Sequence, residues 1–186
     1  GIRHFVMSPG SRNAPIIVAL ARRDGIERHV VVDERSAAFI ALGLAQQTGE
    51  PVAVVCTSGT ALLNYAPAVA EAYYQKLPLI VISADRPMEW IDQDDSQTIR
   101  QYEALAQFVK KSYDLPARCD DDTALWYANR IVNDAVSEAT SSQRAPVHIN
   151  VQIDEPINAV AEWTGKQRII EVSEPSAELS AEAISR

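Results

Sequence analysis

Short runs of apolar, often β-branched residues recur along the chain and indicate strands. The runs fall at 4–8, 29–32, 52–56, 79–83 and 147–151, with a weaker one at 110–115. Each run is nearly continuous rather than alternating, which is typical of parallel strands covered on both faces. We therefore expect a sheet whose strands, 29–32 included, are buried on both sides.

Segments between these runs carry apolar residues at helical spacing. A helix over 36–48 would place Ala37, Ile40, Ala41 and Leu44 on one face and end at Gly49, shortly before a proline. A second helix follows the acidic cap at 120–122, and its apolar face is formed by Leu125, Ala128, Ile131, Val132, Ala135 and Ala139. Between them, Pro67 predicts a short helix or turn before it and a fresh helix after it.

The alternation of strands and helices predicts the fold class. It indicates βαβ units, and hence an α/β fold with a doubly wound, mainly parallel sheet and helices on both faces. The chain has 186 residues, enough for one well-formed core but not for two full domains. With 47% hydrophobic and 23% charged residues, it falls among soluble globular proteins.

Charge and hydropathy exclude two classes of partner. The net charge of -8 and the pI near 4.9 argue against nucleic acid, which requires a basic face. No apolar run is long enough for a membrane span, and no signal peptide is visible. We expect a protein with neither of these partners.

The cysteines and histidines suggest no metal site. Cys56 and Cys119 are too few for a disulfide framework, so we expect reduced thiols in a cytoplasmic protein. His4, His29 and His148 stand at unrelated positions in or beside predicted strands, and we expect no ligand role for them.

Polar residues gather where the predicted strands end. The strand exits read "SPGSR" (8–12), "DER" (33–35), "CTSGT" (56–60) and "SADRP" (83–87). Parallel strands place their carboxyl ends at one edge of the sheet, where ligands of doubly wound folds bind. We expect the functional site at this edge.

Several residues at the strand exits allow two interpretations. Gly10 with Ser11, and Gly59 with Thr60, are either tight turns with helix caps or anion-binding helix N-termini, the first assisted by Arg12. Arg86 either pairs with Asp85 at the surface or points into the cleft. The chain has neither G-x-x-x-x-G-K nor G-x-G-x-x-G, which disfavours nucleotide sites of those types.

The acid pair after the second strand also has two interpretations. Asp33 suits the N-cap of the following helix, where an acid interacts favourably with the helix dipole. Glu34 lies between an apolar strand and the small residues 36–38, a setting that would bury a carboxyl group. Glu34 is therefore the stronger candidate for chemistry.

The order and spacing of these motifs resemble a known family. Over about residues 1–157 the stretches "SPGSR", "DERSAAFIALGLA", "PVAVVCTSGTALLNY", "LIVISADRP" and "SQTIRQ" are similar to the pyrimidine-binding domain of thiamine-diphosphate-dependent enzymes. The combination of "PGSR", "DER" and "ADRP" resembles in particular the synthases of menaquinone biosynthesis that join 2-oxoglutarate and isochorismate.

The resemblance implies roles for individual residues. Glu34 would be the catalytic glutamate that hydrogen-bonds N1′ of the cofactor's aminopyrimidine and favours its imino tautomer. Pro9 and Thr57 would line the aminopyrimidine pocket. The groups that bind the substrate carboxylates would be Ser11, Arg12, Arg86 and Gln97.

The resemblance also implies a larger assembly. The implied transferase decarboxylates 2-oxoglutarate and adds the succinyl unit 1,4 to isochorismate, using thiamine diphosphate held by Mg²⁺ or Mn²⁺. The G-D-G…N motif that binds this metal in the family does not occur in the chain. We therefore expect residues 1–157 to be a pyrimidine-binding domain without its N-terminal helix, and 158–186 to be a linker toward a central domain. The full enzyme would be a homodimer or homotetramer with sites between subunits, and this part alone would be inactive.

Two other functions remain open on the sequence. One keeps the cofactor but changes the reaction, as in acetolactate synthase or a 2-oxoacid decarboxylase. The other is a noncatalytic α/β module that binds an anionic regulator at the "SPGSR" and "CTSGT" turns.

Overall fold

A computed structural model describes residues 1–155, 157 and 168–172. The strands are β1 (His4–Met7), β2 (Glu27–Val30), β3 (Val52–Cys56), β4 (Leu79–Asp85), β5 (Lys111–Leu115) and β6 (Val147–Gln152). The helices are α1 (Ala14–Ala21), α2 (Glu34–Thr48), α3 (Thr60–Asn64), α4 (Ala66–Tyr74) and α5 (Asp122–Thr140), with 3₁₀ turns η1 (Met88–Trp90) and η2 (Ala106–Phe108).

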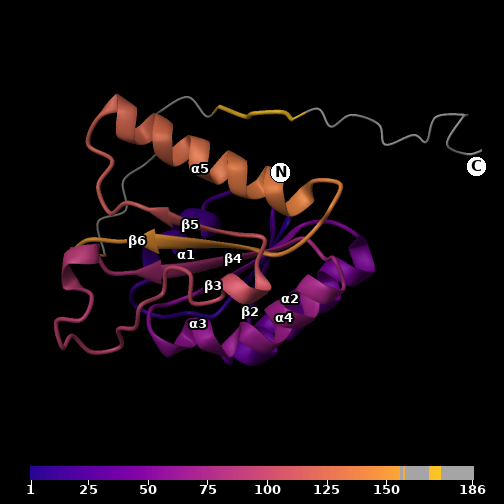
Figure 1. The fold of residues 1–186 in the computed structure, drawn as a ribbon, viewed down its shortest axis with the longest axis horizontal. Coiled ribbons are helices and arrows are strands. Elements are labelled where there is room, and N and C mark those ends of the chain that lie inside the picture. Colours follow the sequence, from indigo (N-terminus) through magenta and orange to yellow (C-terminus); the bar gives the residue numbers. More distant parts are fainter. Residues whose placement is uncertain (156, 158–167, 173–186) are drawn as a thin grey trace, which may run out of the picture.

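The six strands form one sheet in which every pairing is parallel. Their order is β2-β1-β3-β4-β6-β5. Figure 1 shows α5 on one face of this sheet and α2 and α4 on the other. The predicted doubly wound fold is therefore confirmed, and the weak run at 110–115 is indeed a strand.

The central strands divide their side chains between two cores. Val52, Val54 and Cys56 of β3 pack into the core under α2 and α4, while Ala53 and Val55 pack into the core under α5. All five side chains are fully buried. This explains why the run is continuous, because a strand covered on both faces needs apolar residues at every position.

Local signals at the helix ends are confirmed. The Asp33 side chain caps α2, with Oδ1 accepting from the backbone N–H of Ser36 at 2.7 Å. Gly49 follows α2 with φ 70°, in the left-handed region that favours glycine. Pro67 lies in the first turn of α4, directly after the short helix α3.

The prediction that 29–32 is a buried strand is wrong. β2 ends at Val30, forms one edge of the sheet, and leaves Val30 and Val32 66% and 77% exposed. Ile40, placed on the buried face of its helix, is 44% exposed. Local hydrophobicity does not report whether a strand is central or at an edge, because that depends on the order of strands far apart in sequence.

The long helix α5 follows its predicted face only in part. Ile131, Ala135 and Ala139 are buried, whereas Leu125 and Val132 are exposed. The buried residues all lie in the C-terminal half of the helix, where Val132 is nevertheless 41% exposed.

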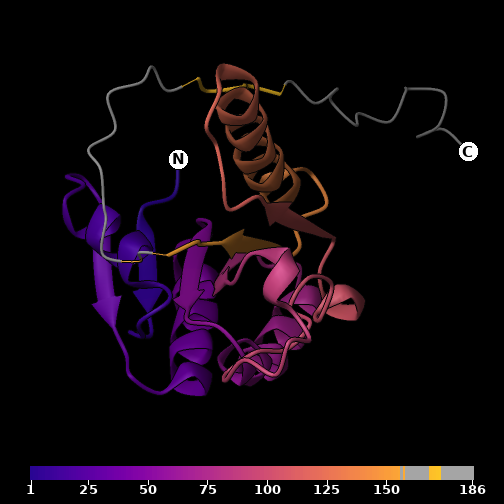
Figure 2. The ribbon, with the colours of Figure 1, turned by 90° about the vertical axis from the view of Figure 1, so that its left-hand side faces the viewer.

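Segment 168–172 lies beside α5 (Figures 1 and 2). The amide of Asn133 donates to the carbonyl of Arg168 at 3.0 Å and accepts from the N–H of Ile170 at 2.9 Å. The rest of the predicted linker 158–186 lies outside the described residues. Among those described, no helix combines the length and the hydropathy needed to cross a membrane.

Candidate functional site at the carboxyl edge of the sheet

The strand order reverses between β1 and β3. From β1 the chain proceeds to β2 on one side, while β3 lies on the other side of β1. Ligands of doubly wound folds bind outside the carboxyl ends of the strands at such a reversal, and we call this position the crevice. The loops that leave β1 and β3 are 8–13 and 57–59, the predicted exits.

Asn13 fixes the loop after β1. It is fully buried, donates through Nδ2 to the carbonyl of Ser8 at 2.8 Å, and accepts from the N–H of Gly10 at 2.8 Å. The Ser8 N–H also donates to the carbonyl of Val55 on β3 at 2.9 Å. Asn13 is absent from the residues predicted from the sequence, although an asparagine just after a Gly-containing turn is a recognised loop-fixing residue.

Gly10 and Thr57 bring the two loops into contact. A Cβ placed on Gly10 would lie 2.5 Å from the Cβ of Thr57, so a side chain larger than hydrogen does not fit there. Thr57 is buried. Pro9 and Ser11, on either side of Gly10, are exposed. The structure thus brings the predicted residues Pro9, Ser11 and Thr57 to the same crevice.

The turn after β3 is held by a loop from beyond β4. Gly59 has φ 81°, and a Cβ there would lie 2.7 Å from the carbonyl oxygen of Gln97. The N–H of Gly59 donates to Oε1 of Gln101 at 2.6 Å, and Nε2 of Gln97 donates to the carbonyl of Ser58 at 3.1 Å. The "SQTIRQ" segment therefore lies against the "CTSGT" turn.

Arg86 is buried within this loop contact. Its guanidinium forms an ion pair with Asp95 and donates to the Ser58 hydroxyl at 3.2 Å and to the Gln97 carbonyl at 3.1 Å. It also donates to the carbonyl of Ser96. The alternative of a surface pair with Asp85 is wrong, because the Asp85 carboxylate accepts instead from the backbone N–H of Arg86 at 2.8 Å.

Arg12 extends from the β1 loop toward the same region. It donates to the Ile153 carbonyl at 3.0 Å and lies 3.4 Å from a carboxylate oxygen of Glu155. The pKa of Asp95 is lowered, first by its hydrogen bond with Arg86 and further by the positive charges of Arg86 and Arg12. Both predicted arginines thus act on one carboxylate at the edge of the sheet.

Glu34 lies at the start of α2, partly buried, where β2 leads into the helix. Its charge reaches two buried groups of the crevice. Burial raises the pKa of the Cys56 thiol and of the Tyr65 phenol, and the negative charge of Glu34 adds to both shifts. Tyr65 in turn lies 3.5 Å from the hydroxyl of Ser8. Glu34 therefore interacts electrostatically with Cys56 at the end of β3 and with Tyr65.

A buried network of polar side chains connects the turn after β3 with strands β4, β5 and β6, and it was not predicted from the sequence. Gln101 donates to Asn150 at 2.9 Å, and Asn150 donates to Asp85 at 3.0 Å and Asp114 at 2.9 Å. The Ser83 hydroxyl bridges Asn150 and His148. A signal was present, because His148, Asn150 and Gln152 alternate along an otherwise apolar strand.

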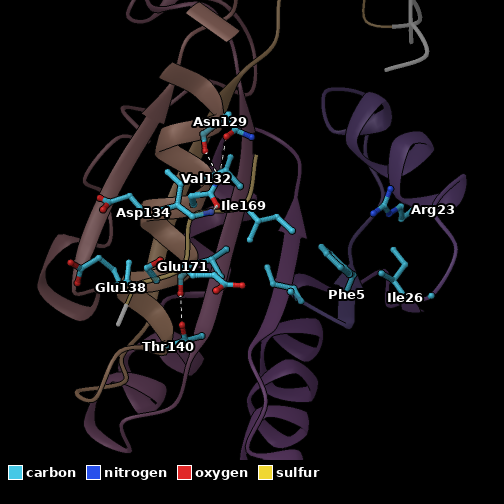
Figure 3. A pocket seen from close by; sticks show the side chains of 18 of the residues that line it. Phe5, Arg23, Ile26, Asn129, Val132, Asp134, Glu138, Thr140, Ile169 and Glu171 are labelled. Carbon is cyan, nitrogen blue, oxygen red and sulfur yellow. Dashed lines mark hydrogen bonds between the residues drawn. The ribbon is translucent and has the colours of Figure 1, made fainter. Parts of the chain in front are cut away.

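The described residues also form a hollow away from this edge. It has a volume of about 1180 Å³ and lies between α5, the 23–26 turn and segment 169–172. Figure 3 shows Val132 and Glu138 of α5 on one side of it and Phe5 and Ile26 on the other. None of the candidate residues lines this hollow.

The carboxyl edge fits one end of thiamine diphosphate better than the other. An uncharged aromatic ring with hydrogen-bonding nitrogens suits this edge. The edge offers the partly buried carboxylate of Glu34, the buried side chain of Thr57, and two loops that lie close together at Gly10. Among the described residues, the one group of three potential metal ligands is at the opposite edge. Within the described part of the chain, this edge therefore holds no cluster of three ligands for a metal-bound diphosphate.

The sequence profile of one family matches the part of the chain that forms this edge. The family is described as "Thiamine pyrophosphate enzyme, N-terminal TPP binding domain", and the match covers residues 1–104. The chain belongs to this family.

Individual relatives within the thiamine pyrophosphate (diphosphate) enzymes are closely similar. The chain is 54% identical over 171 residues to 2-succinyl-5-enolpyruvyl-6-hydroxy-3-cyclohexene-1-carboxylate synthase of Porphyromonas gingivalis, covering 91% of this chain and 30% of the relative. The synthase of the same name from Cytophaga hutchinsonii is 48% identical over 184 residues (98% and 33%), and that from Desulfotalea psychrophila is 55% identical over 157 residues (84% and 29%). The chain thus spans about a third of the length of the relatives it matches.

Proposed function

We propose that this chain is the N-terminal, pyrimidine-binding part of a 2-succinyl-5-enolpyruvyl-6-hydroxy-3-cyclohexene-1-carboxylate synthase. The reaction decarboxylates 2-oxoglutarate and adds the remaining succinyl unit 1,4 to isochorismate. The observation that carries the proposal is the partly buried Glu34 carboxylate beside the crevice between β1 and β3, in a chain 54% identical to such a synthase.

Glu34 is proposed to exchange a proton with N1′ of the aminopyrimidine. When bound, thiamine diphosphate supplies a nucleophilic carbon and stabilises the carbanion left by decarboxylation. The chain is proposed to hold the ring. The absence of a side chain on Gly10 lets the loops after β1 and β3 lie close together, and Thr57 and Pro9 would form the wall beside the ring. A carboxyl group partly shielded from water is better able to share a proton with a weakly basic ring nitrogen than a fully hydrated one.

The proposed substrates carry carboxylates, and the two arginines suit them. Arg86 and Arg12 already act together on the carboxylate of Asp95, whose side chain is 43% exposed. A substrate carboxylate would compete with Asp95 for the guanidinium of Arg86 and with Glu155 for that of Arg12, because a planar fork binds any carboxylate in the same way. Ser11 and Gln97, both exposed at this edge, are proposed as further donors.

The remaining parts of the site are proposed to come from elsewhere in the longer protein. The exposed apolar side chains of Val30, Val32, Phe39 and Ile40 flank Glu34 in sequence, and exposed apolar patches mark interaction surfaces. We propose that the diphosphate-binding domain of a second subunit covers them in a homodimer or homotetramer, and supplies the Mg²⁺ ligands. Two unpaired cysteines suit a cytoplasmic enzyme.

The test uses the full-length protein and its coding sequence. The reading frame should encode a G-D-G…N motif downstream, and the enzyme should consume 2-oxoglutarate and isochorismate with thiamine diphosphate and Mg²⁺. Glu34→Gln should lower kcat by about a hundredfold or more, since proton transfer contributes roughly that much. Glu71→Gln, a surface change on α4, should leave turnover unchanged. Near-normal turnover of the Glu34 variant would refute the assigned role.

A further inference from the structure

Two histidines and a glutamate meet at the amino edge of the sheet, opposite the candidate functional site. His4 begins β1, and Glu27 and His29 belong to β2. The parallel register pairs His4 with Glu27, and His29 lies two residues further on, so all three project from the same face. Among the described residues, they are the one group of three potential metal ligands, with one ligand atom from each lying within 4.8 Å of the others.

One ring nitrogen of each histidine in this cluster is buried without a hydrogen bond. His4 is 7% exposed, yet its buried Nδ1 accepts or donates no hydrogen bond. Nε2 of His29 is likewise buried without a hydrogen-bond partner. The two rings stack with centroids 6.0 Å apart. A buried polar atom without a hydrogen bond is costly, so two of them beside the same carboxylate group require a physical explanation.

Two carboxylates flank the His4 ring, one near each ring nitrogen. Arg3 holds Oε1 of Glu27 at 2.7 Å, which leaves Oε2 facing His4 Nδ1 at 3.4 Å. On the other side of the ring, a carboxylate oxygen of Glu50 lies 3.9 Å from Nε2. A carboxylate behind a histidine fixes the tautomer whose opposite nitrogen binds the metal.

We propose that His4, Glu27 and His29 form a binding site for a divalent transition-metal ion, with Zn²⁺ as the best match. Two imidazole nitrogens and one carboxylate oxygen are a common zinc ligand set, with water as the fourth ligand. Metal–ligand bonds of about 2.0–2.2 Å separate tetrahedral ligand atoms by about 3.4 Å. Small side-chain rotations achieve this from separations of at most 4.8 Å, since Glu27 is half exposed.

The site would tie the edge strand β2 to β1. β2 is bonded to a single neighbouring strand and is largely exposed. A metal ion bridging the two strands stabilises their register, and any ligand that binds only the folded state raises the free energy of unfolding. This role is structural and does not rest on the proposed enzymatic function, because the two sites lie at opposite ends of the strands.

The test is a calorimetric titration of the EDTA-treated, tag-free chain with ZnCl₂. We expect saturable binding of one Zn²⁺ per chain and a higher melting temperature with Zn²⁺. Glu27→Gln and His29→Gln should each weaken binding by at least about tenfold, and Glu50→Gln should cause a smaller loss. Cys119→Ser and Glu71→Gln are matched controls and should bind as the parent does.

The variants also guard against trivial outcomes. Circular dichroism melts without metal show whether each variant folds, and if His29→Gln does not, Glu27→Gln carries the test because its side chain is half exposed. Absence of saturable binding to the parent chain would overturn the proposal. Unchanged affinity in Glu27→Gln, or a loss of binding in Cys119→Ser, would overturn it equally.

Discussion

Replacing Gly10 by alanine tests whether the crevice depends on the contact of its two loops. The added methyl group would lie 2.5 Å from Cβ, 2.7 Å from Cγ2 and 2.8 Å from Oγ1 of Thr57. Gly10 does not have a positive φ, so its backbone accepts alanine and the effect is purely steric. The side chain of Asn13 accepts from the N–H of Gly10 at 2.8 Å, so the loop cannot move away without losing a partly buried hydrogen bond.

The cost follows from overpacking a buried contact. Inserting a methyl group into a filled space costs about 1 to 3 kcal/mol. For a chain of this length, each kcal/mol lowers the melting temperature by about 2 to 4 °C, so a drop of about 2 to 12 °C is expected. Urea unfolding followed by circular dichroism measures the change in the free energy of unfolding.

The same substitution elsewhere provides the control. Gly43 lies inside α2, and no atom lies within 4 Å of the position that a methyl group would take there, so Gly43→Ala should stabilise the chain by about 0.5 to 1 kcal/mol. Thr57→Ala removes two of the three clashing atoms, and the double variant should be more stable than the two single effects predict. If Gly10→Ala were as stable as the parent while Gly43→Ala behaved as expected, the loops would not be in fixed contact.

Three further outcomes follow from the site. Arg86→Ala should lower the free energy of unfolding by about 1.5 to 3 kcal/mol, since several charge-assisted hydrogen bonds are lost, and it should raise KM in the full-length enzyme. Arg86→Lys should recover little of the lost stability, because lysine lacks the planar guanidinium group. Thiamine diphosphate with Mg²⁺ should leave the melting temperature of this chain unchanged, whereas an increase of several degrees would show that the chain binds the cofactor unaided. Burial lowers the pKa of His148 from 6.5 to about 4. Between these two pH values the unfolded chain binds a proton at His148 that the folded chain does not. The free energy of unfolding should therefore fall as the pH falls through this window, by on the order of 3 kcal/mol. The free energy of unfolding, measured in urea as a function of pH, should be compared between the parent and His148→Gln. Their difference reports His148 alone, because Asp85, whose raised pKa has the opposite effect on stability, is present in both. Equal pH profiles of the two proteins would contradict the prediction.

The elements near in sequence were predictable because their signals are local. Strands 52–56, 79–83 and 147–151, the cap at Asp33 and the left-handed Gly49 depend on neighbouring residues and were correctly predicted. The convergence of the strand exits was also predictable, because parallel strands share an edge. The roles of Glu34 and of the arginines remain predictions, because they depend on the chemistry of the group that would bind there.

What only the tertiary structure decided depends on residues far apart in the chain. The exposure of Val30 follows from the edge position of β2, and the partners of Arg86 come from a loop about ten residues further on. The meeting of His4 with His29 follows from strand register, which no local pattern encodes. The amino-acid sequence by itself determined the alternating elements and the polar edge, because hydrophobic period and turn chemistry act over a few residues. Strand order, register and long-range pairing determined which polar groups are buried, which are exposed, and which lie within reach of one another.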